Sequence, residues 1–364
     1  MKAGIVGLPN VGKSTLFNCL SNVKAQSANF PFCTIEPNIG IINVPDKRLS
    51  ILDDLVNPEK IIPATVQILD IAGLVKGASR GEGLGNKFLS NIRETDAIIH
   101  VIRCFDDDNI IHVDGNIDPV RDKEIIDLEL QLKDLELIEK RIEKLSRIAK
   151  SGDTIAIKSL AILKNLKLQI SKSKNIRECS FESSEIQKFV NDLQLLTSKP
   201  VMYLCNVSEK YILNGNEYVD RIKKLALNEK SEVLVLAAST ESEINEFDEF
   251  DDRKLFLNDL GLSESGSEKL IKKTYKLLNQ HTFFTVGKKE VKAWTIPIGI
   301  NASSAAGVIH SDFEKGFIKA EVISYDDFID HGSELKVREA GKVRVEGKEY
   351  IVKDGDIIHF RFNL

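Results

Sequence analysis

The chain has 364 residues, of which 42% are hydrophobic and 29% charged, and its formal net charge is −5 at pH 7. This length predicts two or three domains, and the composition excludes extended disorder and a collagen-like repeat. No stretch approaches the roughly 18 uninterrupted apolar residues that span a bilayer. The acidic balance argues against a protein held on DNA by bulk charge, although a local basic face stays possible.

The cysteines and the N-terminal residues indicate a reduced, cytoplasmic chain. Five widely spaced cysteines, without a C-x-x-C pair, exclude a paired disulfide framework and a zinc knuckle. They are Cys19, Cys33, Cys104, Cys179 and Cys205. The first residues lack the long apolar region of a secretory signal, so we expect no export.

The first hundred residues alternate short apolar runs with polar connections. This alternation predicts a largely parallel α/β sheet. The expected strands are Lys2–Val6, Ile39–Val44, Ile61–Ile71 and Ala97–Cys104, and the expected helices are Leu16–Leu20, Leu49–Val56 and Lys87–Arg93.

A phosphate-binding loop follows the first expected strand. Residues 7–14 fit the pattern G-x-x-x-x-G-K-[ST], in which the backbone N–H groups face the phosphates and a helix begins behind them. Lys13 is expected to reach the terminal phosphates, and the Ser14 hydroxyl to bind Mg²⁺. The predicted nucleotide contacts are Gly7, Leu8, Pro9, Asn10, Val11, Gly12, Lys13, Ser14 and Thr15.

Two further elements complete the expected phosphate and metal site. Asp70 and Gly73 form a D-x-x-G motif at the end of an apolar strand, where the carboxylate serves the metal and the Gly73 N–H meets the γ-phosphate. By analogy with the switch I threonines of other nucleotide hydrolases, Thr34 supplies the second hydroxyl to Mg²⁺. Leu74 stands where many GTPases carry the glutamine that positions the attacking water, so the catalytic group is expected elsewhere.

The base-recognition segment departs from that of guanine-specific proteins. After the expected strand Pro200–Asn206, the chain has Asn206, Val207, Ser208 and Glu209 in place of N-K-x-D. The lysine is absent and the longer Glu209 replaces the aspartate that reads guanine. The Asn206 amide both donates and accepts, which suits the Hoogsteen edge of adenine. A loss of guanine selectivity follows, and a preference for ATP is compatible with it.

A helical segment interrupts the α/β pattern between about 122 and 175. Apolar residues recur at alternating spacings of four and three through Leu128, Leu132, Leu135 and Ile138, which is the seam of a coiled-coil-like helix. The turn at Gly152 predicts a second, antiparallel helix, and a third helix is expected near Ser184–Leu196. Strand signals return at Pro200–Asn206 and Val233–Ala238, so the helices form an insertion in the α/β domain.

The sequence pattern changes again in the C-terminal part. Two helical stretches, Lys254–Leu260 and Ser267–Leu278, precede short strands and glycine turns from His281 to Leu364. This pattern indicates a small, separate α+β domain. Lys288, Lys289 and Lys292 beside Trp294 suit RNA by charge and stacking, and equally suit an ordinary solvated strand face.

Several motifs, in order along the whole chain, resemble the YchF/Obg-like ATPase family. They are residues 7–15, 29–38, 70–78, 206–209, 293–295 and 309–317. The resemblance implies a P-loop domain of the translation-factor class at 1–121 and 199–280, an inserted antiparallel helical arm at 122–198, and a C-terminal TGS domain of β-grasp fold at 281–364. It also implies hydrolysis of ATP in preference to GTP and ribosome binding through the arm and the TGS domain, without membrane or DNA.

Two residues are candidates for the catalytic device. The resemblance points to His112, which could orient or deprotonate the attacking water near neutral pH. The alternative is Asn10, at the place where related hydrolases without the glutamine bind K⁺, which would neutralise charge between the β- and γ-phosphates. The expected cofactors are therefore Mg²⁺ and, through Asn10, K⁺.

Three functions remain open at this point. The favoured one is a slow ATPase that switches a ribosome-bound state in translation or stress regulation. The others are a GTPase acting in ribosome assembly or translation, and an adaptor that binds nucleotide with negligible turnover.

Overall fold

The computed structural model describes residues 1–22, 39–71, 84–113, 115–247 and 249–363. The chain divides into two compact units. The first comprises Met1–Gly40 and Gln67–Ser267, and the second comprises Ile41–Val66 and Glu268–Leu364. An early segment of 26 residues is thus part of the unit that contains the C-terminus.

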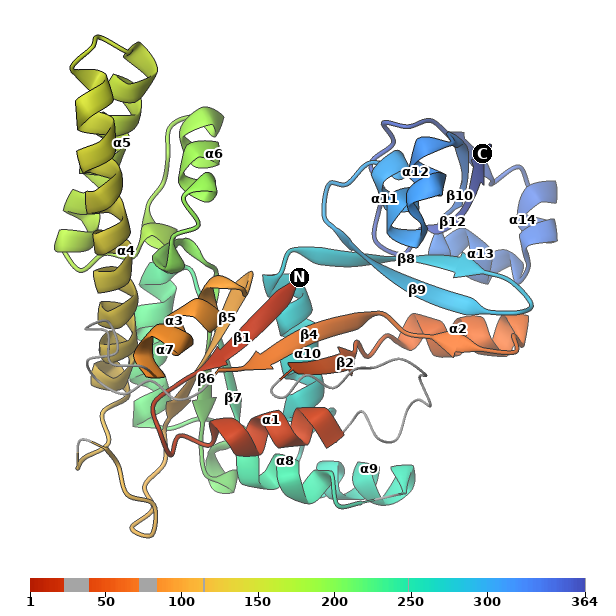
Figure 1. Ribbon diagram of the computed structural model, residues 1–364. Coiled ribbons are helices and arrows are strands. Elements are labelled where there is room, and N and C mark those ends of the chain that lie inside the picture. Colours follow the sequence, from red (N-terminus) through yellow and green to blue (C-terminus); the bar gives the residue numbers. More distant parts are fainter. Residues whose placement is uncertain (23–38, 72–83, 114, 248, 364) are drawn as a thin grey trace. The chain divides into compact units, whose positions relative to one another are not determined.

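A six-stranded sheet in the order β2-β4-β1-β5-β6-β7 carries the first unit (Figure 1). The pairs of β1 with β4 and β5, of β5 with β6 and of β6 with β7 are all parallel, which confirms the predicted α/β fold. Every residue of β5 and β6 is buried, as expected for central strands covered on both faces. The strands are β1 (Lys2–Val6), β2 (Ile39–Asn43), β4 (Thr65–Asp70), β5 (Ala97–Arg103), β6 (Val201–Asn206) and β7 (Glu232–Leu236).

The expected strand Ile61–Ile71 is wrong as a single element. Pro63 interrupts it, because proline has no N–H to donate to a ladder. The chain instead forms β3 (Ile61–Ile62), which pairs with β9 (Val291–Pro297) in the second unit, and then the separate strand β4.

Short helices lie between the strands of the first sheet and after the last of them. Between strands are α1 (Lys13–Asn22), α3 (Leu84–Arg93) and α7 (Glu217–Glu229), and after β7 follow α8 (Ala238–Ile244) and α9 (Phe250–Asp259). The sequence did not predict α7 or α8, although Asn216 caps α7 by accepting the Val219 N–H at 3.1 Å. Buried Glu241 of α8 accepts the backbone N–H groups of Gly266 and Ser267 at 2.7 and 2.9 Å, and so caps α10 (Gly266–Leu277).

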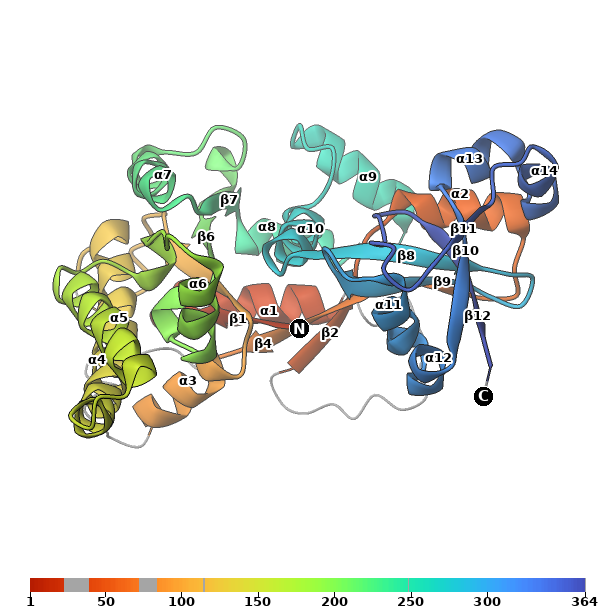
Figure 2. The same cartoon turned by 90° about the horizontal axis from the view of Figure 1, so that it is seen from above.

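Two long helices form an antiparallel hairpin within the first unit. In Figures 1 and 2, α4 (Pro119–Ala149) and α5 (Thr154–Ser171) lie side by side, with α6 (Ser184–Asp192) near them. Asp118 and Asp153 cap the two helices by accepting backbone N–H groups of their first turns. The predicted turn at Gly152 is confirmed, with φ of 87° in the left-handed region.

The buried face of α4 differs from the predicted seam near the base of the hairpin. Leu128 and Leu132 are 52% and 42% exposed, whereas Ile126 and Leu130 are buried. Further along, Ile138 packs with Leu163 and Leu166 of α5. The helix turns a different face inward at its base because it packs there on other elements of the unit, including β5 and α7.

A network of buried charges lies at the base of this hairpin. Lys123 and Asp127 of α4 form an ion pair at 2.9 Å, Arg177 binds Asp127 at 2.8 Å, and Glu229 of α7 pairs with Lys123. The Tyr203 hydroxyl of β6 donates to Glu229. Burial raises the pKa of Asp127, but Arg177 and Lys123 outweigh it and hold the pKa at about 2. The network therefore joins α4 to a central strand and to α7.

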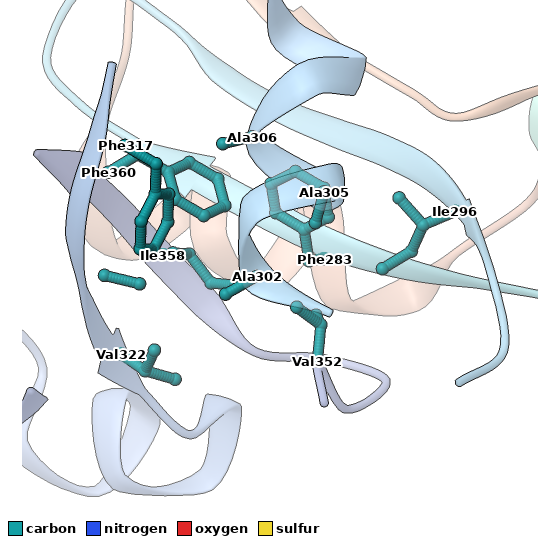
Figure 3. Close-up of a cluster of buried hydrophobic side chains, with 11 residues drawn as sticks. Phe283, Ile296, Ala302, Ala305, Ala306, Phe317, Val322, Val352, Ile358 and Phe360 are labelled. Carbon is teal, nitrogen blue, oxygen red and sulfur yellow. The ribbon is translucent and has the colours of Figure 1, made fainter. Parts of the chain in front are cut away.

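The second unit is built on a mixed six-stranded sheet in the order β11-β10-β12-β8-β9-β3. Its further strands are β8 (Gln280–Val286), β10 (Phe317–Ile323), β11 (Arg344–Glu346) and β12 (Ile357–Phe362). It contains α2 (Lys47–Val56), α11 (Ala302–Ile309), α12 (Ser311–Lys315), α13 (Tyr325–His331) and α14 (Glu334–Glu339), together with most of α10, and of these α11–α14 were not predicted. Figure 3 shows Phe283, Ile296 and Phe360 of the sheet packed with Ala302 and Ala305 of α11.

Candidate nucleotide-binding site

The loop between β1 and α1 has the geometry of a phosphate cradle. Gly12 lies in the left-handed region with φ of 91°, and a Cβ there would approach the Asn206 side-chain nitrogen to 2.3 Å. A Cβ on Gly7 would approach the Val101 carbonyl oxygen to 2.7 Å. Both positions of the motif therefore require glycine. Gly12 needs it for its backbone conformation and for space, and Gly7 needs it for space alone.

Lys13 and Asp70 bring two predicted elements together. Lys13 is the first residue of α1, and its ammonium donates to the carboxylate of Asp70 at the end of β4. Ser14 and Thr15 follow in the same helical turn and are exposed. The site thus combines a helix N-terminus, a cation and two kinds of hard oxygen donor.

Hydroxyl and carboxylate oxygens are the donors that Mg²⁺ prefers, so Ser14 and Asp70 fit this ion. Phosphates and water usually complete its shell, with one or two protein ligands. Within the described residues, there is no group of three or more His, Cys, Asp or Glu side chains that could hold a metal. The other two predicted contacts, Thr34 and Gly73, lie outside the described residues.

Asn206 braces the phosphate loop from the end of β6. Its amide nitrogen donates to the Val11 carbonyl at 3.0 Å, and its amide oxygen accepts the Ala238 N–H at 2.9 Å. Asn206 and Val207 are both buried. The structure therefore gives both ends of this amide partners within the protein, and its contact with the base remains a prediction.

Glu209 occupies an exposed position beside Asn206. It begins a short 3₁₀ helix, Glu209–Tyr211, and its carboxylate accepts from the Thr240 hydroxyl at 3.5 Å. Glu209 thus supplies a carboxylate near the expected position of the base, on a side chain that is one methylene longer than that of aspartate.

A fully buried arginine organises the loop that follows β5. The Arg103 guanidinium donates to the carbonyl oxygens of Phe105, Asp107 and Ile110 at 3.1, 3.1 and 2.9 Å. It also lies over the Phe105 ring, 4.6 Å from the ring centroid. One side chain thereby fixes the path of residues 105–110, a role that the sequence pattern alone did not indicate.

His112 and Asn10 meet the same loop. The Asn10 amide donates to the Ile111 carbonyl at 3.1 Å, so the phosphate loop contacts the residue next to His112. His112 is buried, and its Nε2 lies 2.8 Å from a carboxylate oxygen of Asp122. Asp122 sits in the first turn of α4 and was not predicted as part of the site. The two catalytic candidates therefore lie on adjoining segments, one of which connects directly to the hairpin.

Fold and site together define a nucleotide hydrolase of the P-loop class, with a largely parallel sheet, a glycine-constrained loop and a Lys–Asp pair at its edge. A family model described as a 50S ribosome-binding GTPase matches residues 2–143. The model of the YchF GTPase C-terminal region, described as a protein of unknown function, matches residues 280–363.

The similarity to particular relatives extends over the entire chain. The ribosome-binding ATPase YchF of Bacillus subtilis is 54% identical over 366 residues, covering 100% of both chains. The protein of the same name from Escherichia coli O157:H7 is 51% identical, covering 100% of this chain and 99% of the relative. The structure of the Schizosaccharomyces pombe YchF GTPase is 39% identical with a TM-score of 0.91, covering 99% of this chain and 97% of that one. The chain belongs to the YchF family.

Proposed function

We propose that this protein is a ribosome-binding ATPase that binds and slowly hydrolyses ATP in preference to GTP. Full-length identity to proteins named ribosome-binding ATPase supports the activity and the partner. The observation that carries the nucleotide preference is the base position, where Asn206 is followed by Val207 and Glu209 instead of Lys and Asp.

The physical argument for ATP concerns the edge of the base. Guanine offers N–H donors at N1 and the 2-amino group, which an aspartate accepts in guanine-specific sites. Adenine offers an acceptor at N1 and no 2-amino group, so a carboxylate there gains nothing. Glu209 is exposed, and in binding adenine it need not make the two hydrogen bonds that an aspartate makes to guanine. We assign Asn206 to the Hoogsteen edge of the base.

Phosphate binding and metal binding are assigned to the first unit. Lys13 binds the β- and γ-phosphates, and the backbone of residues 7–12 surrounds them. Ser14, Thr34 and Asp70 hold Mg²⁺, and Gly73 meets the γ-phosphate. When bound, the ion neutralises the charge that develops on the phosphate oxygens.

Catalysis is assigned to the contact between Asn10 and the His112 loop. His112 orients or deprotonates the attacking water, and Asn10 contributes to a K⁺ site near the phosphates. The Asn10 hydrogen bond to Ile111 supports this assignment because it brings the two segments together.

The ribosome is the proposed macromolecular partner. We assign its binding to the helical arm at 122–198 and to a TGS domain of β-grasp fold at 281–364, with the nucleotide domain at 1–121 and 199–280. The antiparallel α4–α5 hairpin and the mixed sheet of the second unit support these assignments. Among the helices of the described residues, none is long and apolar enough to cross a membrane.

Phosphate release from ATP and from GTP tests the proposal directly. It is measured with and without purified ribosomes, in K⁺ and in Na⁺, with Lys13→Ala as the control that lacks the phosphate ligand. We expect faster turnover of ATP than of GTP and slower turnover in Na⁺. Faster turnover of GTP would instead assign the chain to the GTPases, the activity for which the Schizosaccharomyces pombe YchF GTPase and the 50S ribosome-binding GTPase family are named. No turnover under any condition would make it an adaptor.

A further inference from the structure

The outer part of α4 and the returning helix α5 carry a charge opposite to that of the rest of the protein. Residues 140–174 contain ten Lys or Arg and two Asp or Glu, a net charge of +8. The remaining chain has 40 basic and 53 acidic residues, a net charge of −13, because the total is 50 against 55. The molecule is therefore acidic with one strongly basic segment, which its overall charge conceals.

Part of this charge lines a groove between α3 and α4. The groove has a volume of about 470 Å³ and lies entirely within the first unit. Its lining contains five cations, one carboxylate and one apolar side chain, and these are Arg93, Lys133, Lys140, Arg141, Lys144, Glu136 and Leu137. Positions 133, 137, 140, 141 and 144 follow the helical repeat, so the α4 residues share one face.

The single carboxylate does not neutralise this groove. Glu136 binds Lys133 at 2.7 Å and Lys140 at 2.6 Å, and these two hydrogen bonds hold its pKa at about 2. Arg141 and Lys144 are exposed and form no ion pair with any residue that the structure describes. The lining keeps a formal charge of +4, with cations directed to solvent.

The second helix of the hairpin extends the same charge. Helix α5 contains Lys158, Lys164 and Lys167 and no acidic residue. Lys158 and Lys164 are exposed, and Lys167 pairs with Glu139 at 2.7 Å. Both helices of the hairpin thus present basic side chains near its end.

We propose that this groove and the adjoining basic end of the hairpin bind the phosphate backbone of RNA. From Lys133 to Lys144 the stripe rises roughly 16 Å along the helix axis. That length is sufficient to contact several phosphates of one strand. Spaced lysine and arginine cations suit a row of phosphates. Lysine binds phosphate as a point charge and arginine through its planar guanidinium, and neither contact reads bases.

The composition of the hairpin distinguishes RNA from an acidic protein as the partner. Residues 122–174 include no Phe, Trp or Tyr, the residues that dominate the centre of protein–protein interfaces. Without these aromatic rings, charge dominates the expected contact with RNA, so the binding should depend little on sequence and strongly on salt. The inference rests on the proposed ribosome association and assigns one of its contacts.

The test compares two triple variants of the full chain that remove equal charge. The first, Lys140→Gln, Arg141→Gln and Lys144→Gln, removes three of the five cations of the groove, and glutamine preserves the helix. The matched control, Lys223→Gln, Lys224→Gln and Lys254→Gln, alters exposed lysines of α7 and α9. Thermal melting and ATP titration establish that both variants fold and bind nucleotide.

The first measurement is fluorescence anisotropy with a labelled 20-nucleotide single-stranded RNA of mixed sequence over a series of KCl concentrations. Loss of three phosphate contacts should lower the slope of log K against log salt by about 2 and weaken binding on the order of tenfold at low salt. The control should keep both values within about twofold of the unaltered chain. An equal loss in both variants, or no change in slope, would overturn the inference.

Two further measurements identify the partner and separate this inference from the proposed function. Polyglutamate that binds as tightly as RNA and loses affinity in the groove variant would assign the groove to acidic proteins and refute RNA. Co-sedimentation with ribosomes tests the proposed function itself. An unaltered chain that fails to sediment refutes ribosome association, whereas a groove variant that sediments normally and binds RNA normally refutes only the groove.

Discussion

At the scale of single residues, the chemistry of the site depends on how side chains from separate segments restrain each other. Asn206 holds Val11 of the phosphate loop, Asn10 holds Ile111, and Asp122 holds His112. Each contact joins residues distant in sequence, with the exception of the last pair. The phosphate loop and the His112 loop are therefore positioned as one assembly.

Replacing His112 tests its proposed catalytic role. His112→Ala should slow ATP hydrolysis by about 10² to 10⁴, the range expected for loss of a general acid or base. Its ATP affinity should stay within about twofold, because no phosphate contact is assigned to it. The rate comes from single-turnover phosphate release and the affinity from calorimetry. His310→Ala, at an exposed histidine of the second unit, is the control. Hydrolysis at the normal rate by His112→Ala would refute the role.

Buried His100 of β5 should make stability depend on pH. Burial lowers its pKa to about 4, although nearby Asp127 opposes the shift while Lys123 and Arg177 reinforce it. The unfolded chain binds the proton more readily, so the neutral histidine contributes stability above pH 6.5. That contribution falls away as the pH drops from about 6.5 to 4 and is at most about 3 kcal/mol.

Thermal melting of His100→Gln over this pH window provides the measurement. The melting temperature of the variant should change less between pH 6.5 and 4 than that of the unaltered chain. Asp127, whose pKa is about 2, loses its contribution to stability only below about pH 4. Its titration therefore lies outside the pH range that is compared. Identical pH profiles for the two proteins would contradict the role of His100. His310→Gln should leave the profile unchanged.

At the scale of elements, α4 is the link between the catalytic loop and the hairpin. Its first turn holds Asp122, its next turns hold the buried ion pairs of Lys123 and Asp127, and the stretch from Lys133 to Lys144 carries the basic groove. A second anchor lies at Asp134, whose carboxylate accepts the backbone N–H groups of Leu196 and Thr197 at 2.9 and 2.8 Å. The helix is thus fixed to the sheet unit along its lower half.

Asp134→Ala should destabilise the first unit. The change leaves two buried N–H groups without acceptors and removes the bond from the Thr197 hydroxyl, which together should cost about 3 kcal/mol in the free energy of unfolding. Urea unfolding followed by far-ultraviolet circular dichroism measures it. Asp220→Ala, at an exposed position with only a 3.8 Å ion pair, should cost less than about 0.5 kcal/mol. Similar losses in the two variants would show that Asp134 is no anchor.

At the scale of the whole molecule, local signals were predictable and long-range ones were not. The phosphate loop could be predicted because its glycines, Lys13 and Ser14 are consecutive and follow a buried strand. The partner of His112 could not, since many acidic residues precede the hairpin and only the fold selects Asp122. The network of Lys123, Arg177, Tyr203 and Glu229 likewise joins residues up to 106 positions apart.

The expected strand Ile61–Ile71 illustrates a different limit of prediction from the sequence. Pro63 was visible in the sequence, and its missing N–H excludes a continuous central strand. What the sequence could not indicate is that β3 would pair with β9, more than 200 residues later, because ladder partners depend on the complete fold. Helices α11–α14 of the second unit were missed for a related reason. Helices α12–α14 are only five to seven residues long, too short to show a clear period.

The central claim is that the P-loop site prefers ATP to GTP, and calorimetric titration with the two nucleotides in Mg²⁺ tests it most directly. Non-hydrolysable analogues of both keep turnover out of the measurement. We expect the ATP analogue to bind at least tenfold more tightly, a difference of about 1.4 kcal/mol. Equal affinities, or tighter binding of the GTP analogue, would contradict the claim.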